Sequence, residues 1–224
     1  MKNNNYFKKG AILDLASIRG KYTTKNFDIK DLNKNPFKQF EVWFNDALNE
    51  NLLEPNAFSL STVGSDMMPS IRTVLLKYFD NEGFVFFTNY ESKKAKQIEQ
   101  NPKAAALFTW LALERQIKIE ANIEKISKAD SLKYFLSRPK GSQLGAWVSR
   151  QSETISSRAL LEQKFDEMKR KFLNKEIPFP SFWGGYILKP IRIEFWQGGE
   201  DRLHDRFLYE LKENSEWTIS RLAP

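Results

Sequence analysis

The stretch 116–126 alternates strictly between apolar and polar side chains. Its apolar members are Ile117, Ile119, Ala121 and Ile123, and the residues between them are Gln116, Lys118, Glu120 and Asn122. Because successive side chains of a strand point to opposite faces, the pattern predicts an antiparallel strand with one buried and one solvated face. We therefore expect a fold built around an antiparallel sheet.

Apolar, β-branched runs bounded by turn residues predict the remaining strands. They span 57–63, 70–79, 83–89, 104–111, 184–188, 191–197, 206–211 and 217–221, and Gly64-Ser65-Asp66 forms the turn of a hairpin. About eight strands with inserted helices indicate a mainly β fold with α-helices (α+β), arranged as a closed or partly open antiparallel barrel.

Helices are predicted at 36–49, 93–101, 128–137 and 156–174. Asn35 is placed to cap the first of these and Pro36 to occupy its first position. The aromatic residues of that helix recur at helical spacing, which indicates core packing. Residues 1–35 are polar and predict a mobile arm with one helical turn near 12–18, and residues 36–224 predict a single domain.

The composition excludes several kinds of site. The 224 residues contain no Cys and one His, so disulfides, thiolate metal sites and Cys nucleophiles are absent and a structural zinc site is not expected. No signal peptide and no run of about 20 apolar residues is present, so a cytoplasmic protein without a membrane partner is expected. The net charge of +7 favours anionic ligands. The basic residues form scattered short pairs, which disfavours nucleic acid.

The single histidine lies in the run Arg202-Leu203-His204-Asp205-Arg206. If this run is extended, Arg202, His204 and Arg206 share one face and repel one another unless an anionic or electron-rich group lies among them. The arginines should then keep His204 neutral. The alternative is a solvated strand face on which Asp205 is a loose counter-ion.

Two further groups of basic residues suit anions. Arg72 and Lys77 bracket an apolar strand and are predicted on opposite faces, where they could serve two different anions. Lys93 and Lys94 fall in the first turn of a helix capped by Ser92, a place where free N–H groups bind phosphate. Charged strand ends and a solvated basic helix face are the alternatives.

Tyr134 and Arg138 are four residues apart on a predicted helix and share a face. Lys140-Gly141-Ser142 is predicted as a turn, so phenol, guanidinium and hydroxyl could form a cradle for a phosphate dianion. The polar, turn-like stretch 143–147, with Gln151 and Ser152, suits a heteroaromatic ring or a phosphate. Together these features predict two phosphate-sized sites beside an aromatic, polar pocket. The chain has no Gly-rich nucleotide fingerprint, P-loop or nucleophile elbow.

From about Ile18 to Pro224 the chain resembles the pyridoxine/pyridoxamine 5′-phosphate oxidase family. The resemblance rests on seven motifs: Arg72–Lys77, Leu113–Gln116, Tyr134–Pro139, Gly145–Ser149, Pro180–Gly185, Glu194–Phe207 and Arg221–Pro224. It implies an antiparallel FMN-binding split β-barrel with peripheral helices, which acts as a homodimer with its sites at the subunit interface. The implied reaction of vitamin B6 metabolism converts pyridoxamine 5′-phosphate and pyridoxine 5′-phosphate to pyridoxal 5′-phosphate, with O2 becoming H2O2.

The resemblance also implies roles for individual residues. FMN would be held by Arg72, Thr73, Val74, Leu75, Leu76, Lys77, Phe87, Thr88, Lys93, Lys94, Gln116, Gln151, Ser152, Trp196 and Arg206. The substrate phosphate would be bound by Lys77, Tyr134, Arg138 and Ser142, and the pyridine ring by Arg202, Leu203 and His204, of which Arg202 and His204 would be catalytic. An N-terminal lid would contain Arg19, Gly20, Lys21 and Tyr22.

The chain departs from the family pattern at Phe87, where Tyr is common, and at Lys93, where Arg is common. Both changes keep the backbone contact or the positive charge. Two alternatives remain: a related split-barrel flavoprotein that acts on another substrate, and a basic, non-enzymatic binding module.

Overall fold

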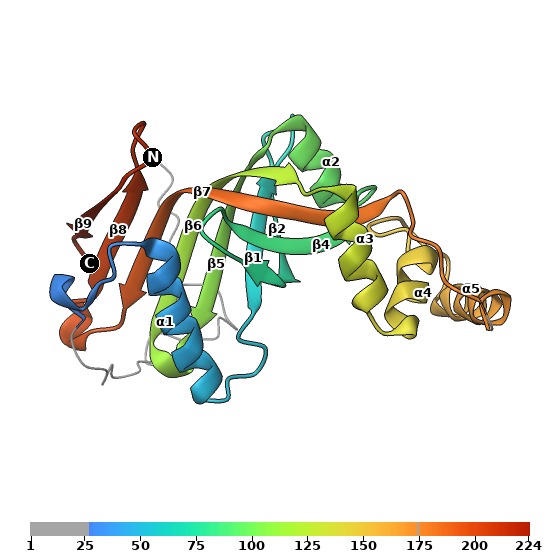
Figure 1. The fold of residues 1–224 in the computed structure, drawn as a ribbon, viewed down its shortest axis with the longest axis horizontal. Helices are drawn as coiled ribbons and strands as arrows, with labels where there is room; N and C mark the ends of the chain where they lie inside the picture. Colours follow the sequence, from blue (N-terminus) through green and yellow to red (C-terminus); the bar gives the residue numbers. More distant parts are fainter. Residues whose placement is uncertain (1–26, 174) are drawn as a thin grey trace, which may run out of the picture.

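The computed structural model describes residues 27–173 and 175–224. Its strands form one nine-stranded antiparallel sheet in the order β2-β1-β5-β6-β7-β4-β3, and β8 and β9 continue from β7. The sheet curls into a half-barrel (Figure 1). The strands are β1 (Ala57–Val63), β2 (Pro69–Leu75), β3 (Tyr78–Phe79), β4 (Phe84–Asn89), β5 (Lys103–Trp110), β6 (Arg115–Lys125), β7 (Trp183–Gln197), β8 (Asp205–Leu211) and β9 (Trp217–Leu222).

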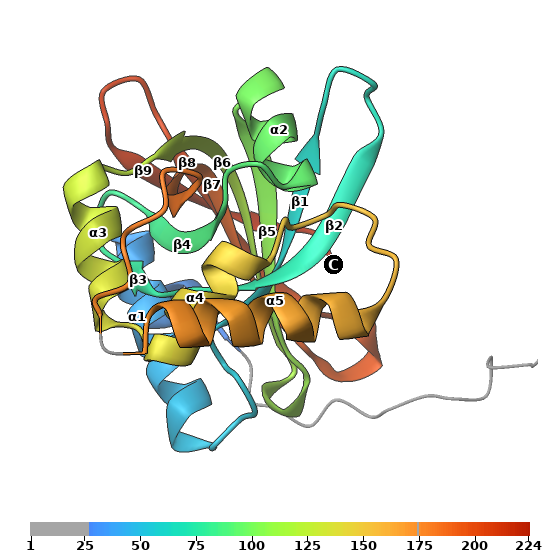
Figure 2. The ribbon, with the colours of Figure 1, turned by 90° about the vertical axis from the view of Figure 1, so that its right-hand side faces the viewer.

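The α-helices lie around this sheet. Figure 1 shows α1 beside the sheet and α3, α4 and α5 together at its far end, where Figure 2 views them from the front. The helices are α1 (Pro36–Asn49), α2 (Lys93–Gln100), α3 (Lys128–Ser137), α4 (Lys140–Val148) and α5 (Arg158–Lys171), with short 3-10 turns at Ile29–Asp31, Leu111–Leu113 and Glu200–Arg202. Within the described ranges no helix is long and apolar enough to cross a membrane.

The longest strand, β7, joins the two ends of the sheet. Its first half pairs with β4, its second half pairs with β8, and β6 pairs with it from Tyr186 to Gln197. The register shifts where Glu120 faces Arg192 and Ala121 faces Pro190, which leaves Ile191 as a bulge. The strands predicted at 184–188 and 191–197 are therefore one strand, because a bulge lets a proline remain within a sheet.

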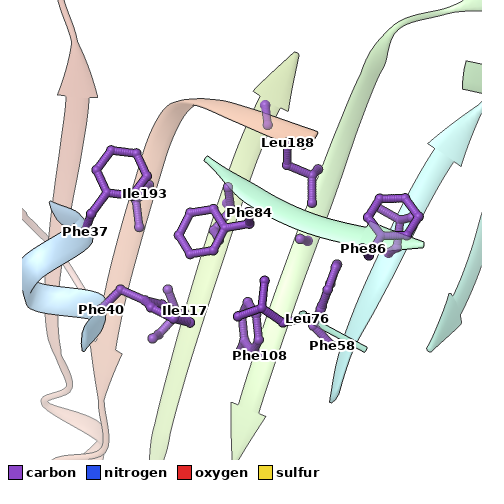
Figure 3. Close-up of a cluster of buried hydrophobic side chains, with 14 of the residues drawn as sticks. Phe37, Phe40, Phe58, Leu76, Phe84, Phe86, Phe108, Ile117, Leu188 and Ile193 are labelled. Atoms are coloured by element: carbon purple, nitrogen blue, oxygen red, sulfur yellow. The ribbon is translucent and has the colours of Figure 1, made fainter. Parts of the chain in front are cut away.

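Helix α1 supplies the aromatic part of the core. The Asn35 side chain accepts hydrogen bonds from the N–H groups of Phe37 and Lys38, and Pro36 is the first helical residue, as predicted. The Phe40 ring is fully buried and lies 4.8 Å from Phe84 and 5.1 Å from Phe108, measured between ring centroids. Figure 3 shows these rings meeting between the helix and the sheet. The predicted core role of the aromatic stripe is confirmed.

Most of the other predicted elements are confirmed with small shifts at their ends, and two further predictions are wrong. The strand predicted over 70–79 ends at Leu75, and Tyr78–Phe79 forms the separate strand β3. The stretch predicted as turn and loop over 140–147 is helix α4, whose Leu144 and Ala146 are buried in a second core cluster. The predicted helical turn at 12–18 lies outside the described residues. Phe27, within the predicted arm, packs in the main core.

Replacing Phe40 by alanine is expected to lower the free energy of unfolding by about 3–5 kcal/mol, because the cavity would open among several rings. Urea unfolding followed by circular dichroism measures the change. The matched control is Val42→Ala on the same helix, where the side chain is 51% exposed. That variant should stay within about 0.5 kcal/mol of the parent. Equal losses in both variants would contradict the assignment of Phe40 to the core.

Candidate active site

A cleft lies between β2, β4 and the N-terminus of α2 on one side and α3 and α4 on the other. Its volume is about 970 Å³. The described residues that line it include five cationic side chains and no acidic one. The cationic members are Arg72, Lys77, Lys93, Lys94 and Arg138. Such a lining suits a ligand with more than one negative charge.

One corner of the cleft is built at the start of α2. Ser92 caps the helix as predicted, by accepting a hydrogen bond from the Ala95 N–H. The Lys94 ammonium is buried and donates to Gln151 Oε1 at 2.7 Å and to Thr88 Oγ1 at 2.9 Å. Burial lowers the pKa of Lys94 to about 8, and the charge of nearby Arg72 adds to the shift. Neutral acceptors thus hold a cation that is still able to attract an anion.

A second corner is built where α3 ends. The Tyr134 ring stacks on Phe87 at 3.9 Å, and the guanidinium of Arg138 lies 4.6 Å from the ring centre of Trp183. The Nη1 atom of Arg138 is buried and has no hydrogen-bond partner within the described residues. Burial lowers the pKa of Arg138 and raises that of Tyr134. A buried donor without an acceptor is costly, so an anion bound in this corner would supply the acceptor that Arg138 lacks.

Ser142, which also belongs to the second corner, lies in a helix, whereas the sequence predicted a turn at this position. It lies in the first turn of α4, and its N–H donates to the Pro139 carbonyl. Pro139 precedes the helix, so Ser142 follows Arg138 closely in sequence, and both residues line the cleft.

The prediction that Arg72 and Lys77 serve opposite faces is wrong, because both line this cleft. The regular alternation on which it rested stops when β2 ends at Leu75, before Lys77 is reached. Leu76, which was predicted to contact FMN, is 4% exposed and belongs to the core.

The run that contains the histidine is not extended along its whole length, so the condition for a shared face of Arg202, His204 and Arg206 is not met. Glu200–Arg202 is a 3-10 turn in which Asp201 and Arg202 have positive φ angles of 51° and 64°, and β8 begins only at Asp205. The left-handed residues Asp201 and Arg202 break the alternation, so Arg202 does not lie on one extended strand with His204 and Arg206.

His204 and Arg206 contact residues of the neighbouring strand β7, the Gly199 backbone and the end of the chain. His204 Nδ1 accepts the Gly199 N–H at 3.1 Å, and its ring lies 4.6 Å from the Trp196 ring. Burial, Arg202 and Arg206 together lower the pKa of His204, in the predicted direction. Arg206 donates to Glu194 Oε1 at 2.7 Å and to the Ala223 carbonyl at 2.8 Å.

The predicted site residues therefore fall into two groups within one subunit. The cleft group lines the cleft and consists of Arg72, Thr73, Val74, Leu75, Lys77, Phe87, Thr88, Lys93, Lys94, Tyr134, Arg138, Ser142, Gln151 and Ser152. The loop group consists of Gln116, Trp196, Arg202, Leu203, His204 and Arg206, none of which lines that cleft. Cross-strand pairs of Gln116 with Trp196 and of Trp196 with Arg206 keep these three loop-group residues together. Arg19, Gly20, Lys21 and Tyr22 lie outside the described residues.

Some residues that line the cleft were not predicted from the sequence to be part of the site. Trp183 was noted only as part of a motif, yet it stacks near Phe87 and lies under Arg138. Its position next to a Gly-Gly pair at a strand start was the available signal. Asn89 and Ser149 also line the cleft; Ser149 was noted only within the motif Gly145–Ser149, and neither residue was predicted as part of the site.

The depressed pKa of Lys94 makes the stability of the cofactor-free protein depend on pH. The ammonium should titrate near pH 8 when folded and near 10.5 when unfolded. The burial penalty is therefore present in full below about pH 8 and is relieved as the pH rises towards 10.5. We expect Lys94→Met to raise the free energy of unfolding at pH 7 and to raise it less at pH 9.5. Urea unfolding at both pH values tests this, and a gain that grows with pH would contradict it.

Comparison with known proteins identifies the family that has this architecture. Residues 44–172 match the family described as Pyridoxamine 5′-phosphate oxidase, and residues 183–224 match the Pyridoxine 5′-phosphate oxidase C-terminal dimerisation region. A pyridoxine/pyridoxamine 5′-phosphate oxidase of Aliarcobacter butzleri is 75% identical over 95% of this chain and 100% of its own. The enzyme of the same name from Rippkaea orientalis is 61% identical over the same shares.

Among solved structures, PhzG from Burkholderia lata, in complex with tetrahydrophenazine-1-carboxylic acid, superposes with a TM-score of 0.85. It is 27% identical and covers 92% of this chain and 100% of its own. An FMN-binding protein from Nostoc punctiforme, related to pyridoxamine 5′-phosphate oxidase, shares the fold with a TM-score of 0.70 at 18% identity, over 86% of this chain and 100% of its own. The split-barrel fold expected from the sequence is therefore confirmed, and the chain belongs to the pyridoxine/pyridoxamine 5′-phosphate oxidase family.

Proposed function

We propose that the chain oxidises pyridoxamine 5′-phosphate and pyridoxine 5′-phosphate to pyridoxal 5′-phosphate at the cleft described above, as an FMN-dependent homodimer of the cytoplasm. The observation that carries this proposal is the pair of cationic corners in one cleft without acidic lining residues among those described. Two corners suit two phosphates, one on the cofactor and one on the substrate. The close relatives named above support the same reaction.

The residues of the cleft fit FMN. Arg72, which is half-buried, and Lys94, which is buried, provide cations that no carboxylate neutralises within the described residues, and Lys93 begins the helix beside them. The FMN phosphate would be bound there, with Thr88, Gln151 and Ser152 as further polar contacts. The backbone of β2 from Thr73 to Leu75 lines the cleft and would lie against the flavin. Bound FMN supplies the redox chemistry, in which two electrons leave the substrate and reduce O2 to H2O2.

The second corner would hold the substrate phosphate. Lys77, Tyr134, Arg138 and Ser142 line it, and the buried Nη1 of Arg138 would gain an acceptor there. Contacts to the phosphate are remote from the carbon that is oxidised, so they contribute binding energy that fixes the reacting end in place. A substrate without a phosphate would leave this corner incomplete, which disfavours a related flavoprotein function.

The loop group would orient the pyridine ring. His204 accepts the Gly199 N–H at Nδ1, so the neutral imidazole carries its proton on Nε2 and can donate it to a substrate. Arg202 keeps its positive charge and would stabilise negative charge that develops on the ring. The residues 19–22 remain a predicted lid, within a predicted arm of residues 1–35 that precedes the domain of residues 36–224.

Each complete site would combine the cleft group of one subunit with the loop group of its partner. Leu203 is 72% exposed in the single subunit, although its side chain is large and apolar. The region 183–224, which contains most of the loop group, matches a dimerisation region. Dimerisation would cover Leu203. It would also bring Arg202 and His204 to the cleft of the partner subunit, since they do not line the cleft of their own subunit.

The visible spectrum tests the reaction. The purified protein should show bound flavin that bleaches without air when pyridoxine 5′-phosphate is added, then recovers in air while pyridoxal 5′-phosphate forms. The variant Arg202→Leu should keep its flavin and bleach far more slowly, because Arg202 would act on the substrate and not on FMN retention. Flavin that does not bleach in the parent protein would move the function to another substrate. A protein that stays colourless with added FMN would support the basic binding module.

Subunit mixing tests the shared site. Arg138→Met damages the cleft group and Arg202→Leu damages the loop group, so each homodimer should be nearly inactive. When the two chains are co-expressed, half of the dimers are hybrids with one native site each, and about a quarter of the parental activity should return. The control is either variant co-expressed with a tagged copy of itself. Activity that does not rise above this control would place both groups in one subunit's site.

A further inference from the structure

We propose that Thr62 and Gln97 are positioning residues that fix the guanidinium of Arg72 for the FMN phosphate. The inference rests on the proposed function, which places that phosphate beside Arg72 and Lys94. Neither Thr62 nor Gln97 lines the cleft, and both act through Arg72.

Three oxygen atoms of the protein accept hydrogen bonds from the guanidinium of Arg72. Arg72 Nη1 donates to Thr62 Oγ1 at 2.6 Å and to the Leu60 carbonyl at 3.1 Å, and Nη2 donates to Gln97 Oε1 at 3.4 Å. The Thr62 hydroxyl in turn donates to Gln97 Oε1 at 2.7 Å. Thr62 and Gln97 therefore form a linked pair of acceptors along the edge of the guanidinium that contains Nη1 and Nη2.

The other edge of the Arg72 guanidinium, which contains Nε and Nη2, is left for a ligand. A guanidinium carries five N–H donors, and within the described residues three of them are used by Leu60, Thr62 and Gln97. The remaining two belong to Nε and Nη2. They form a fork that matches two oxygens of a phosphate, and Arg72 lines the cleft in which such a ligand would lie.

The support itself is rigid. Thr62 is 1% exposed and Gln97 is 5% exposed, on β1 and α2 respectively. The Gln97 amide nitrogen donates to Ser70 Oγ at 3.3 Å, which turns its oxygen towards Arg72. Both ends of this amide are therefore fixed, and the pair cannot rotate freely away from the guanidinium.

The neutrality of both acceptors matters for function. A glutamate at position 97 would hold Arg72 equally well but would cancel the charge that attracts a phosphate. Burial already lowers the pKa of Arg72, since no carboxylate offsets its desolvation. A hydroxyl and an amide orient the guanidinium and leave its charge available to the ligand.

The test compares FMN with riboflavin, which has the same ring but lacks the phosphate. Dissociation constants of both flavins are measured by fluorescence on the cofactor-free protein. We expect Thr62→Val and Gln97→Leu each to weaken FMN binding about tenfold, the loss expected for one hydrogen bond to a charged group. Riboflavin binding should not change. Thr62→Ser, which restores the hydroxyl, should restore the parental preference for FMN.

Gln100→Leu is the matched control. Gln100 is on the same helix and accepts a hydrogen bond from the Ser65 N–H, away from Arg72, so its loss should leave both constants unchanged. Equal weakening of FMN and riboflavin by Thr62→Val would indicate a general structural role and would overturn the inference.

Arg72→Met separates this inference from the proposed function. If that variant keeps the parental preference for FMN over riboflavin, the phosphate site itself is misassigned and the inference fails with it. If Arg72→Met loses the preference while Thr62→Val and Gln97→Leu keep it, the phosphate site stands and only the positioning role is refuted.

Discussion

The hydrogen-bonded register of strand β7 determines where both parts of the candidate site lie. Gly185 pairs with Phe87 on β4, which places the Phe87 ring beside the cleft, while Trp196 pairs with Arg206 on β8 at the other end of the strand. A Cβ atom on Gly185 would lie 2.5 Å from Ile126 and 2.9 Å from Phe87, so only glycine fits without displacement. A slip of the register by one residue would turn every side chain of β7 to the opposite face of the sheet. The close approach at Gly185 and the buried face of β7 both oppose such a slip, so they fix the positions of the cleft group and of the loop group.

The two groups differ in how their charges are balanced. In the loop group, Arg206 pairs with Glu194, and Arg221 nearby pairs with Asp205. In the cleft, the hydrogen bonds of Arg72 and Lys94 go to hydroxyl, amide and carbonyl oxygens. The first arrangement stabilises the fold by itself, whereas the second costs stability until an anion binds. The cofactor-free protein is therefore expected to be less stable than the protein with an anion bound in the cleft.

Local signals in the sequence were enough for most of the fold and for the residue types of the site. Alternation predicted β6, and cap residues predicted the starts of α1 and α2. The failures arose where distant contacts outweigh local preference. Two glycines, Gly141 and Gly145, indicated a loop, but burial of Leu144 and Ala146 in the second core cluster stabilises a helix there. The division into cleft and loop groups could not be read from the sequence, since it depends on strand order, and Gln97 resembled one more polar residue on a basic helix.

The cation-lined cleft also bears on how fast ligands arrive. Five positive side chains around one opening, with no acidic side chain among the described lining residues, create a field that reaches beyond contact distance. At physiological ionic strength this field decays over about 8 Å, so it draws phosphorylated molecules only during their final approach. Association rates for FMN and for the substrates should therefore depend on ionic strength more strongly than dissociation rates do. If the cleft binds phosphates as proposed, selection of phosphorylated vitamers over their free alcohols and amines begins at encounter, before any specific hydrogen bond has formed.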